Sequence, residues 1–480
     1  MAILSEEDEL FVRDQIIPAF KGGRTIEQLE SGTKSVNDST IEVSQNGQSR
    51  KVSLSEAVVT AQNGYCGRYW EEMSSTPMAA GYCGSLDMLR NLPGLLGLGC
   101  YLVRDDRSRR KLDPTNHYRF EDGTPAKLDG SMGQYMWCWN AHYFTTWMEG
   151  TRTYYAISFT PLAGKKSYRI PAGGTSALGA GVIDRTNNIL CSIVNSDPQF
   201  RGGGNQAAWD GSVISQLGMP ATAYRYGGYS ELARKRGEGW EANWYVAQAV
   251  TEYLFMIIMG TRNSQEAFIA AKDANGLYQG GLGPGVTSFS VWGDYNGYYP
   301  LIPCRAGIEL GDSCGEVPFD ILGSDGNISS TVKIPVFFGL KNFYGHTWSV
   351  VSGLVTNVGA EKTEHFVAPS LYEGWSQTDT SALLKAAESP RSEGWIKKKS
   401  FNLLCRMPTE VGASNTTYYC DYFWHTPSSQ GLRACLSSSH AAAGATAGAF
   451  CTYSHGALSA ADAHVSSPLC YFAEDPIMTN

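Results

Sequence analysis

The chain has 480 residues, of which 42% are hydrophobic and 18% charged, a composition typical of folded globular proteins and unlike that of disordered or coiled-coil chains. This length is enough for two or three domains. The formal net charge of −8 disfavours binding to a nucleic-acid backbone, and we expect Lys397, Lys398 and Lys399 to form a solvated surface run.

The first twenty residues lack the pattern of a secretory signal, because acidic residues at 6–9 stand where a basic start would be needed. The longest strongly apolar run, 253–259, has seven residues, whereas a membrane span needs about 20. We therefore expect no signal peptide and no membrane insertion, and a chain made in the cytoplasm. The 12 cysteines form no CxxC pair, and we expect mostly buried, reduced thiols.

Several elements are predicted in chain order. A capping pattern at Ser5 predicts a helix over about 5–20, the turn Asn46-Gly47 predicts a hairpin over 41–52, and a second helix is predicted over about 53–62. Aromatic density rises from about residue 130, which indicates a boundary. We expect an N-terminal attachment or oligomerisation region over 1–125 and a ligand-binding domain over 126–480.

The second region is predicted to be α+β with irregular loops. Its clearest helix is expected over 241–259, where Trp244, Ala247, Leu254 and Ile258 fall on one stripe and Gly260 ends the pattern. Many short, glycine-punctuated segments surround this helix.

Catalytic and metal-binding motifs are mostly missing. The chain has no HExxH, P-loop or paired CxxC pattern. Gly311 to Gly315 matches GxSxG, but a nucleophile elbow must lead into a helix and Pro318 prevents one, so we expect a tight turn. His425, His440, His455 and His464 crowd into the last 56 residues with Cys451 nearby, but acidic residues to support metal ligands are scarce there. We expect no metal and no cofactor.

The segment 437–468 has the most unusual composition. Ala, Gly, Ser and Thr fill 22 of its 32 positions, and Lys, Glu, Gln, Met and Trp are absent, although their overall frequency would give about five. One interpretation is a low-complexity loop of small residues. However, strand-like segments over 431–436 and 466–472 flank it and Phe450 offers an apolar anchor, so an ordered segment is favoured.

The segment resembles the variable proteins of diversity-generating retroelements, which include phage receptor-binding (tropism) proteins. In that family a Gly-Leu-Arg segment leads into small-residue repeats and a closing strand. Here Gly431-Leu-Arg433 precedes a small-residue repeat over 440–450 and another over 455–465. Weaker similarity covers 254–265, 280–283 and 310–311. The resemblance implies a C-type lectin-like fold of formylglycine-generating-enzyme type at the C-terminus, preceded by a smaller mixed N-terminal region.

The family's mechanism implies which positions vary. Template Asn codons altered at their adenines never encode Lys, Glu, Gln, Met or Trp, the five types absent here, and Trp424 is by the same logic fixed. The implied variable region is about 420–468, with Gly444, Ala447, Gly448, Phe450, Ala457 and Leu458 as constant scaffold. The ligand-binding, diversified positions implied by the resemblance are Tyr422, Phe423, His425, His440, Ala442, Ala443, Thr446, Cys451, Tyr453, His455, Gly456, Ala460, Asp462 and His464.

The function implied is that of a non-enzymatic receptor-binding protein displayed on a virion, in the tail fibre or other host-attachment apparatus of a bacteriophage. Its partners would be a surface receptor of a host bacterium, protein or glycan, and other virion or tail proteins, with a trimer as one expected oligomer. Two alternatives remain open. One is a formylglycine-generating or carbohydrate-active enzyme that uses the C-terminal His and Cys residues, and the other is a bacterial ligand-binding protein outside any phage.

Overall fold

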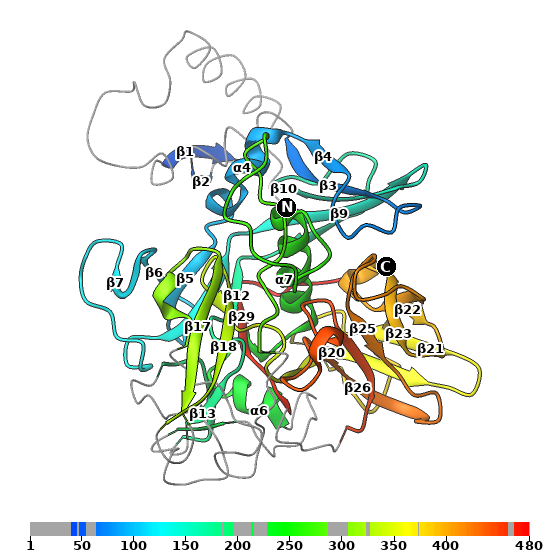
Figure 1. The fold of residues 1–480 in the computed structure, drawn as a ribbon. Helices are drawn as coiled ribbons and strands as arrows, with labels where there is room; N and C mark the ends of the chain where they lie inside the picture. Colours follow the sequence, from blue (N-terminus) through cyan, green and yellow to red (C-terminus); the bar gives the residue numbers. More distant parts are fainter. Residues whose placement is uncertain are drawn as a thin grey trace.

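The computed structural model describes residues 64–184, 187–194, 228–286, 306–322, 327–372, 374–458 and 465–479, together with the backbone of three short strands, 40–45, 48–53 and 213–215. The fold is mixed and rich in strands, with 12% helix and 40% strand, and one of its sheets is nearly closed (Figure 1). In the described part of the chain, no helix is long and apolar enough to cross a membrane.

Two sheets are built mainly from the first half of the chain. The five-stranded sheet has the order β11-β9-β10-β3-β4, and the seven-stranded sheet has the order β16-β29-β12-β8-β5-β6-β7. Their strands are β3 (Tyr65–Glu71), β4 (Gly81–Gly84), β5 (Gly99–Val103), β6 (Arg109–Asp113), β7 (Asn116–Phe120), β8 (Gln134–Trp139), β9 (His142–Glu149), β10 (Arg152–Ser158), β11 (Ser167–Ile170), β12 (Gly173–Ser176), β16 (Trp240–Ala242) and β29 (Leu469–Phe472).

Both sheets join strands from either side of residue 125. β3 pairs with β10, and β5 pairs with β8, each along the full length of the shorter strand. Residues 64–120 therefore share their sheets with residues 134–176, and the boundary expected at residue 125 does not separate two hydrogen-bonded units there. The last strand, β29, lies between β12 and β16 and brings the C-terminal end of the chain into the same sheet.

The nine-stranded sheet holds the C-terminal half of the chain. Its order is β22-β21-β20-β26-β27-β25-β23-β24, with β28 paired to β20. The two end strands approach each other, and the Ser389 hydroxyl on β22 donates to the Pro408 carbonyl on β24. The strands are β20 (Trp348–Val358), β21 (Thr363–Val367), β22 (Leu384–Ser389), β23 (Gly394–Lys399), β24 (Pro408–Val411), β25 (Tyr422–Trp424), β26 (Gly431–Ser437), β27 (Thr452–Gly456) and β28 (Val465–Ser466). The ordered strands predicted on both sides of the small-residue segment are thus confirmed.

Smaller elements complete the structure. The expected hairpin is confirmed as β1 (Thr40–Gln45) and β2 (Gln48–Ser53), whereas the helices expected over 5–20 and 53–62 lie outside the described residues. At the GxSxG match, β17 begins at Gly315 with no helix after Ser313, so the expected turn is confirmed. The remaining elements are α4 (Leu86–Leu95), α6 (Gly228–Arg234), β13 (Val182–Asp184), β14 (Ile189–Cys191), β15 (Val213–Ser215), η4 (Ile308–Leu310), β17 (Gly315–Leu322), β18 (Ile328–Phe337), β19 (Leu340–Lys341), η5 (Asn402–Leu404) and η6 (Gly444–Thr446).

The central element is α7 (Tyr245–Met259), which contacts strands β3, β10, β12 and β20 and so touches all three large sheets (Figure 1). It ends at Gly260, whose φ of 70° gives a left-handed cap, as the sequence predicted. It begins four residues later than expected, because Trp240–Ala242 pairs with β29 as strand β16. All of its residues are buried, so the single predicted apolar stripe understates how enclosed it is.

A charged side chain lies in the middle of this buried helix. The Glu252 carboxylate accepts hydrogen bonds from Lys399 Nζ at 2.7 Å and from Arg406 Nη1 at 2.8 Å, and all three side chains are fully buried. Lys399 was expected to belong to a solvated run with Lys397 and Lys398, and this expectation was wrong. Register shifts between Ile396 and Lys398 and between Lys398 and Lys399 interrupt the alternation of β23, and Lys399 turns inward, where a buried carboxylate compensates its charge.

We predict that Glu252→Gln lowers the free energy of unfolding by about 3–5 kcal/mol, because two cations would remain buried without a counter-charge. The matched control is Glu410→Gln, which removes the surface pairs with Lys397 and Lys398 and should change the denaturation midpoint little. Chemical denaturation of both variants checks this, and equal midpoints for the two would contradict the assigned role of Glu252.

Candidate ligand-binding surface

Most of the implied variable positions in the described residues reach the surface. Ala442 is exposed, and the others that reach the surface are half-buried with part of the side chain accessible. Ala460, Asp462 and His464 lie outside the described residues. We call the accessible group the C-terminal patch; it consists of Tyr422, His440, Ala442, Ala443, Thr446, Tyr453 and His455.

Strand geometry explains which side chains of the segment point outward. In β27, Tyr453 and His455 are accessible, while Thr452, Ser454 and Gly456 are buried. In β25, Tyr422 and Trp424 flank the buried Phe423. The two strands are parallel, with Trp424 opposite Tyr453, so the outward faces of both strands lie side by side. Alternation therefore separates exposed from buried positions within the same few residues.

Aromatic rings form a row across this face, in two close groups on the neighbouring strands β25 and β27. Tyr453 stacks on His455 with ring centroids 4.1 Å apart, and Tyr422 lies 4.7 Å from Trp424. Trp395 on β23 extends the row beyond Tyr422, with the two centroids 5.5 Å apart. Such rings offer large contact areas at a small entropic cost.

The buried Trp348 joins the row to the turn that follows β26. Its ring lies 5.4 Å from that of Tyr453 and 5.9 Å from that of His440. The aromatic row and the small residues after His440 therefore form one surface rather than two.

Four implied positions do not reach the surface. Phe423 and Cys451 are 0% exposed and His425 is 2% exposed, since each faces the interior of the sheet. Gly456 is also buried, and a Cβ there would lie 3.0 Å from Leu436 Cδ1. These four residues cannot contact a ligand in this structure, and a larger side chain at any of them would disturb the core.

Two histidines near the patch, His425 and His455, have pKa values below that of a solvent-exposed imidazole. Burial, together with the nearby His455 and Arg391, lowers the pKa of His425 to about 4. Its two ring nitrogens face the Thr363 hydroxyl at 3.1 Å and the Ser454 hydroxyl at 3.0 Å. Burial also lowers the pKa of His455, against the opposing effect of its bond to the Trp424 carbonyl. Both imidazoles are therefore mostly neutral at pH 7 and serve as hydrogen-bonding aromatic groups rather than as cations.

Main-chain hydrogen bonds hold the turn between β26 and β27 from below. The Phe450 N–H donates to Asp421 Oδ2 at 2.7 Å, and the Phe450 carbonyl accepts from Lys399 Nζ at 3.1 Å. Ser264 Oγ accepts from the Ala449 N–H at 2.9 Å, and Gln265 Nε2 donates to the Gly444 carbonyl at 3.1 Å. Side chains from outside the turn, three of them buried and Gln265 half-buried, thus fix the backbone that presents the patch.

The Asp421 carboxylate lies so close to the backbone of residue 448 that only glycine fits there. Gly448 has φ +152°, and a Cβ there would lie 2.0 Å from Asp421 Oδ1. Burial raises the pKa of Asp421 well above its usual range, although the Phe450 N–H and Lys399 act in the opposite direction.

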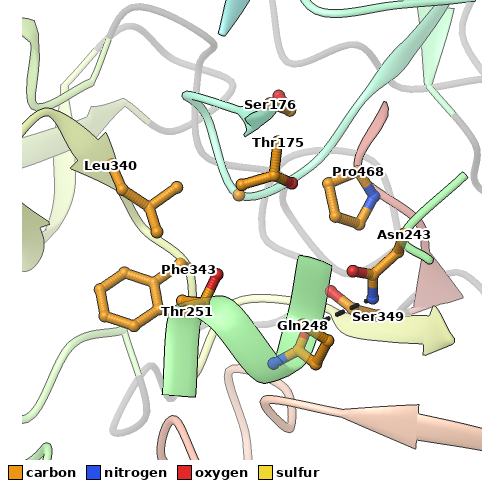
Figure 2. A pocket seen from close by; sticks show the side chains of 10 residues that line it. Thr175, Ser176, Asn243, Gln248, Thr251, Leu340, Phe343, Ser349 and Pro468 are labelled. Carbon is orange, nitrogen blue, oxygen red and sulfur yellow. Dashed lines mark hydrogen bonds between the residues drawn. The ribbon is translucent and has the colours of Figure 1, made fainter. Parts of the chain in front are cut away.

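A small cavity with a mixed polar and apolar lining lies beside α7 (Figure 2). It is lined by Gln248 and Thr251 of the helix and by Asn243, Ser349 and Thr175, among others, and Asn243 Nδ2 donates to Gln248 Oε1 at 3.3 Å. Its volume of about 20 Å³ leaves room for about one water molecule. This cavity is therefore too small to bury a substrate.

Sequence reasoning missed the residues that support the patch from other segments. Trp348 and Trp395 precede the unusual segment, and their place in the aromatic row depends on strand pairings that no local pattern reveals. Ser264 and Gln265 do fall in the upstream stretch for which a weak similarity was noted. No protein-family model matches the chain, and no curated protein matches it significantly.

We predict that Gly448→Ala destabilises the protein strongly, because the added Cβ overlaps the Asp421 carboxylate that holds the Phe450 N–H. The matched control is Gly444→Ala in the same segment. Gly444 has φ +56° and no atom of the described residues lies within 4 Å of its Cβ position, so only the left-handed backbone costs stability there, about 1–2 kcal/mol. Thermal unfolding of the two variants checks this prediction. If Gly448→Ala lowered the melting temperature no more than Gly444→Ala does, the supporting role assigned to Asp421 would be contradicted.

Proposed function

We propose that this chain is a non-enzymatic receptor-binding protein of a bacteriophage particle, and that a retroelement diversifies its C-terminal patch to change target specificity. In this proposal the nine-stranded sheet and α7 belong to a C-type lectin-like fold of formylglycine-generating-enzyme type. The receptor would be a protein or glycan on the surface of a host bacterium.

The observation that carries the proposal is the division of one short segment into two classes of position. Seven of the eleven implied variable positions in the described residues are accessible, Tyr453 and His455 among them, and four are buried. Of the six implied constant residues, three are buried (Ala447, Gly448 and Phe450) and three reach the surface (Gly444, Ala457 and Leu458). Accessible side chains can change with effects on stability that stay mostly within about 0.5 kcal/mol, while changes in the core cost several times more. This division supports a surface whose specificity changes while the fold is kept.

The chemistry of the patch indicates where its affinity would come from. Ala442, Ala443 and Thr446 have small side chains, so they contribute to the shape of the surface but make few strong contacts with a ligand. Tyr422, Tyr453 and His455, with their neighbour Trp424, are the aromatic anchors, the residue types that dominate interface energetics. A modest single-site affinity would suit a virion that presents several copies, since avidity can add a factor of about 10² or more.

The alternative of an enzyme that uses the C-terminal Cys and His residues has weaker support. Burial raises the pKa of the Cys451 thiol, and the residue is 0% exposed. A nucleophilic cysteine requires access to substrate and a stabilised thiolate, and Cys451 lacks both in this structure. His425 is equally enclosed.

The pattern of variation between sister genes tests the diversification directly. We expect substitutions at adenine-containing codons to concentrate at the seven patch positions and to spare Gly448 and Phe450, with a near-copy of the segment and a reverse transcriptase gene close by. Sister genes that are identical across the patch, or that vary equally at Phe450, would contradict the proposal.

Binding to whole cells of the bacterial host tests the surface itself. The double variant Tyr453→Ala, His455→Ala should reduce binding of the purified protein at least about tenfold, because it removes the stacked pair at the centre of the aromatic row. The matched control is Tyr118→Ala, which removes a 50% exposed tyrosine on β7, and it should bind as the parent does. Equal binding by all three proteins would place the receptor contact elsewhere.

A further inference from the structure

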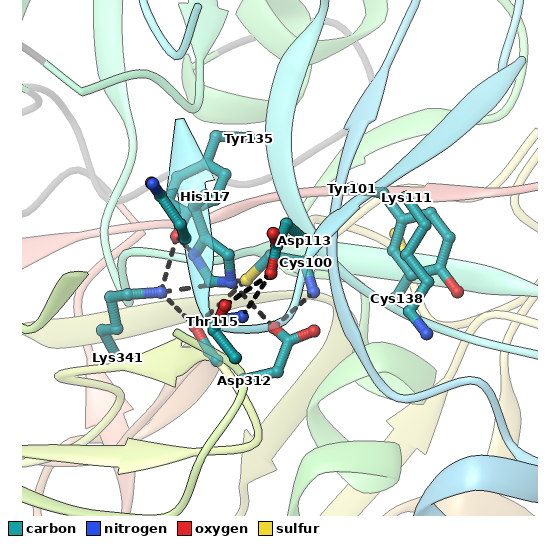
Figure 3. A network of polar contacts seen from close by, with 12 residues as sticks. Cys100, Tyr101, Lys111, Asp113, Thr115, His117, Tyr135, Cys138, Asp312 and Lys341 are labelled. Atoms are coloured by element: carbon teal, nitrogen blue, oxygen red, sulfur yellow. Dashed lines mark hydrogen bonds and ion pairs between the residues drawn. The ribbon is translucent and has the colours of Figure 1, made fainter. Parts of the chain in front are cut away.

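Three side chains with metal-ligating atoms meet far from the patch, where strands of the seven-stranded sheet contact the loop before β17 (Figure 3). Cys100 lies on β5, His117 on β7 and Asp312 just after η4. One potential ligand atom from each lies within 4.8 Å of the other two. Cys100 and His117 are 0% and 1% exposed, so the cluster is enclosed.

Hydrogen bonds orient the histidine of this cluster. His117 Nε2 faces Asp312 Oδ1 at 3.0 Å, and Nδ1 faces the Tyr135 hydroxyl. A metal-bound histidine typically donates its second ring N–H to a neighbouring acceptor, which fixes the ring and the tautomer. Tyr135, which is itself buried, occupies the place of that acceptor.

One feature leaves the cluster incomplete without a cation. The Asp312 side chain is 8% exposed, and its Oδ2 is buried with no hydrogen-bond partner among the described residues, whereas Oδ1 accepts from the Cys100 N–H at 2.9 Å. Gly339, with φ +93°, lets the backbone approach the cluster closely, because a Cβ there would lie only 2.6 Å from Asp312 Oδ1 and 2.7 Å from Cys100 Sγ. A buried carboxylate oxygen without a partner is costly, and a metal ion would compensate it.

We propose that Cys100, His117 and Asp312 bind a zinc-type divalent ion. Thiolate, imidazole and carboxylate together favour Zn²⁺ or Co²⁺ over Mg²⁺ or Ca²⁺, which prefer oxygen ligands alone. Tetrahedral zinc, at about 2.0–2.3 Å from its ligands, separates them by about 3.3–3.8 Å. The distance between His117 Nε2 and Asp312 Oδ1, now 3.0 Å, would have to increase slightly. The largest distance between two of the ligand atoms, at most 4.8 Å, would have to decrease by at most about 1.5 Å.

The site would stabilise the fold by linking separate segments of the chain. Asp312 lies 195 residues after His117 and 212 after Cys100, and the ion would join β5 and β7 to the loop that leads into the β17–β18 hairpin. A bound metal stabilises the folded state because the unfolded chain has no preformed site.

Lys341 provides the competing interpretation. Its buried Nζ donates to the Tyr135 hydroxyl at 2.7 Å and to the Gly339 carbonyl at 2.6 Å, and lies 3.8 Å from Cys100 Sγ. Its ammonium group could therefore supply the positive charge that Asp312 requires, in which case the protein would bind no metal here.

Metal analysis of the full-length protein decides between the two. After removal of metals and addition of Co²⁺ or Zn²⁺ followed by desalting, we expect about one bound equivalent, a thiolate-to-cobalt charge-transfer band, and a melting temperature that rises with Zn²⁺ and falls with a chelator. Retention of no metal, or a cobalt spectrum without a thiolate band, would overturn the proposal whether or not any variant folds.

Matched cysteine variants locate the site. Cys100→Ser should abolish the thiolate band and weaken Zn²⁺ binding by more than about 100-fold, because it removes a ligand rather than a supporting contact. The control is Cys138→Ser, which alters an equally buried cysteine on the adjacent strand β8 and should retain the metal. Loss in both variants, or in neither, would contradict the assignment.

Discussion

The Glu252 carboxylate at the centre of α7 is the constraint on which the rest of the structure depends. It is fully buried and accepts hydrogen bonds from both Lys399 and Arg406. Lys399 also donates to the Phe450 carbonyl, while Asp421 accepts from the Phe450 N–H. One helix that contacts three sheets is thereby linked through charged groups to the middle of the small-residue segment. A buried ion pair of this kind contributes little net stability compared with apolar packing, but breaking it is costly, so it favours one arrangement of the segment.

This arrangement accounts for how a segment so poor in large side chains stays ordered. Ala, Gly and Ser bury little apolar surface, so the segment cannot hold itself by its own packing. Order comes instead from the buried Phe450 and from main-chain hydrogen bonds to Asp421, Lys399, Ser264 and Gln265, none of which lies within the segment. Most of the support for this backbone therefore comes from residues outside the patch, although Tyr453 also packs on the buried Trp348. Support from outside the patch is the property that a diversified binding surface would need.

The sequence predicted those parts of the structure that local patterns determine. The hairpin at Asn46-Gly47, the end of α7 at Gly260, the strands around the small-residue segment and the buried Phe450 follow from turn residues, capping and periodicity. What depends on pairing between distant segments was not predictable from one sequence. Lys399 looked like part of a surface run, but a register shift in β23 turns it inward. Phe423 is buried by alternation along β25, whereas Cys451, just before β27, is buried although it has the parity of the accessible Tyr453 and His455. The cluster of Cys100, His117 and Asp312 has no spacing signature because its members come from separate elements.

The central claim is that the framework tolerates exchange of the patch side chains, and proteolysis of displayed libraries tests it most directly. One library would randomise Tyr422, His440, Ala442, Ala443, Thr446, Tyr453 and His455 together, and a second would randomise the buried Phe423, Ala447, Ala449, Phe450 and Cys451. The account predicts that most members of the first library resist protease as the parent does and that few members of the second do. Equal survival of the two libraries would show that accessible and buried positions of the segment are not energetically distinct, and would contradict the account.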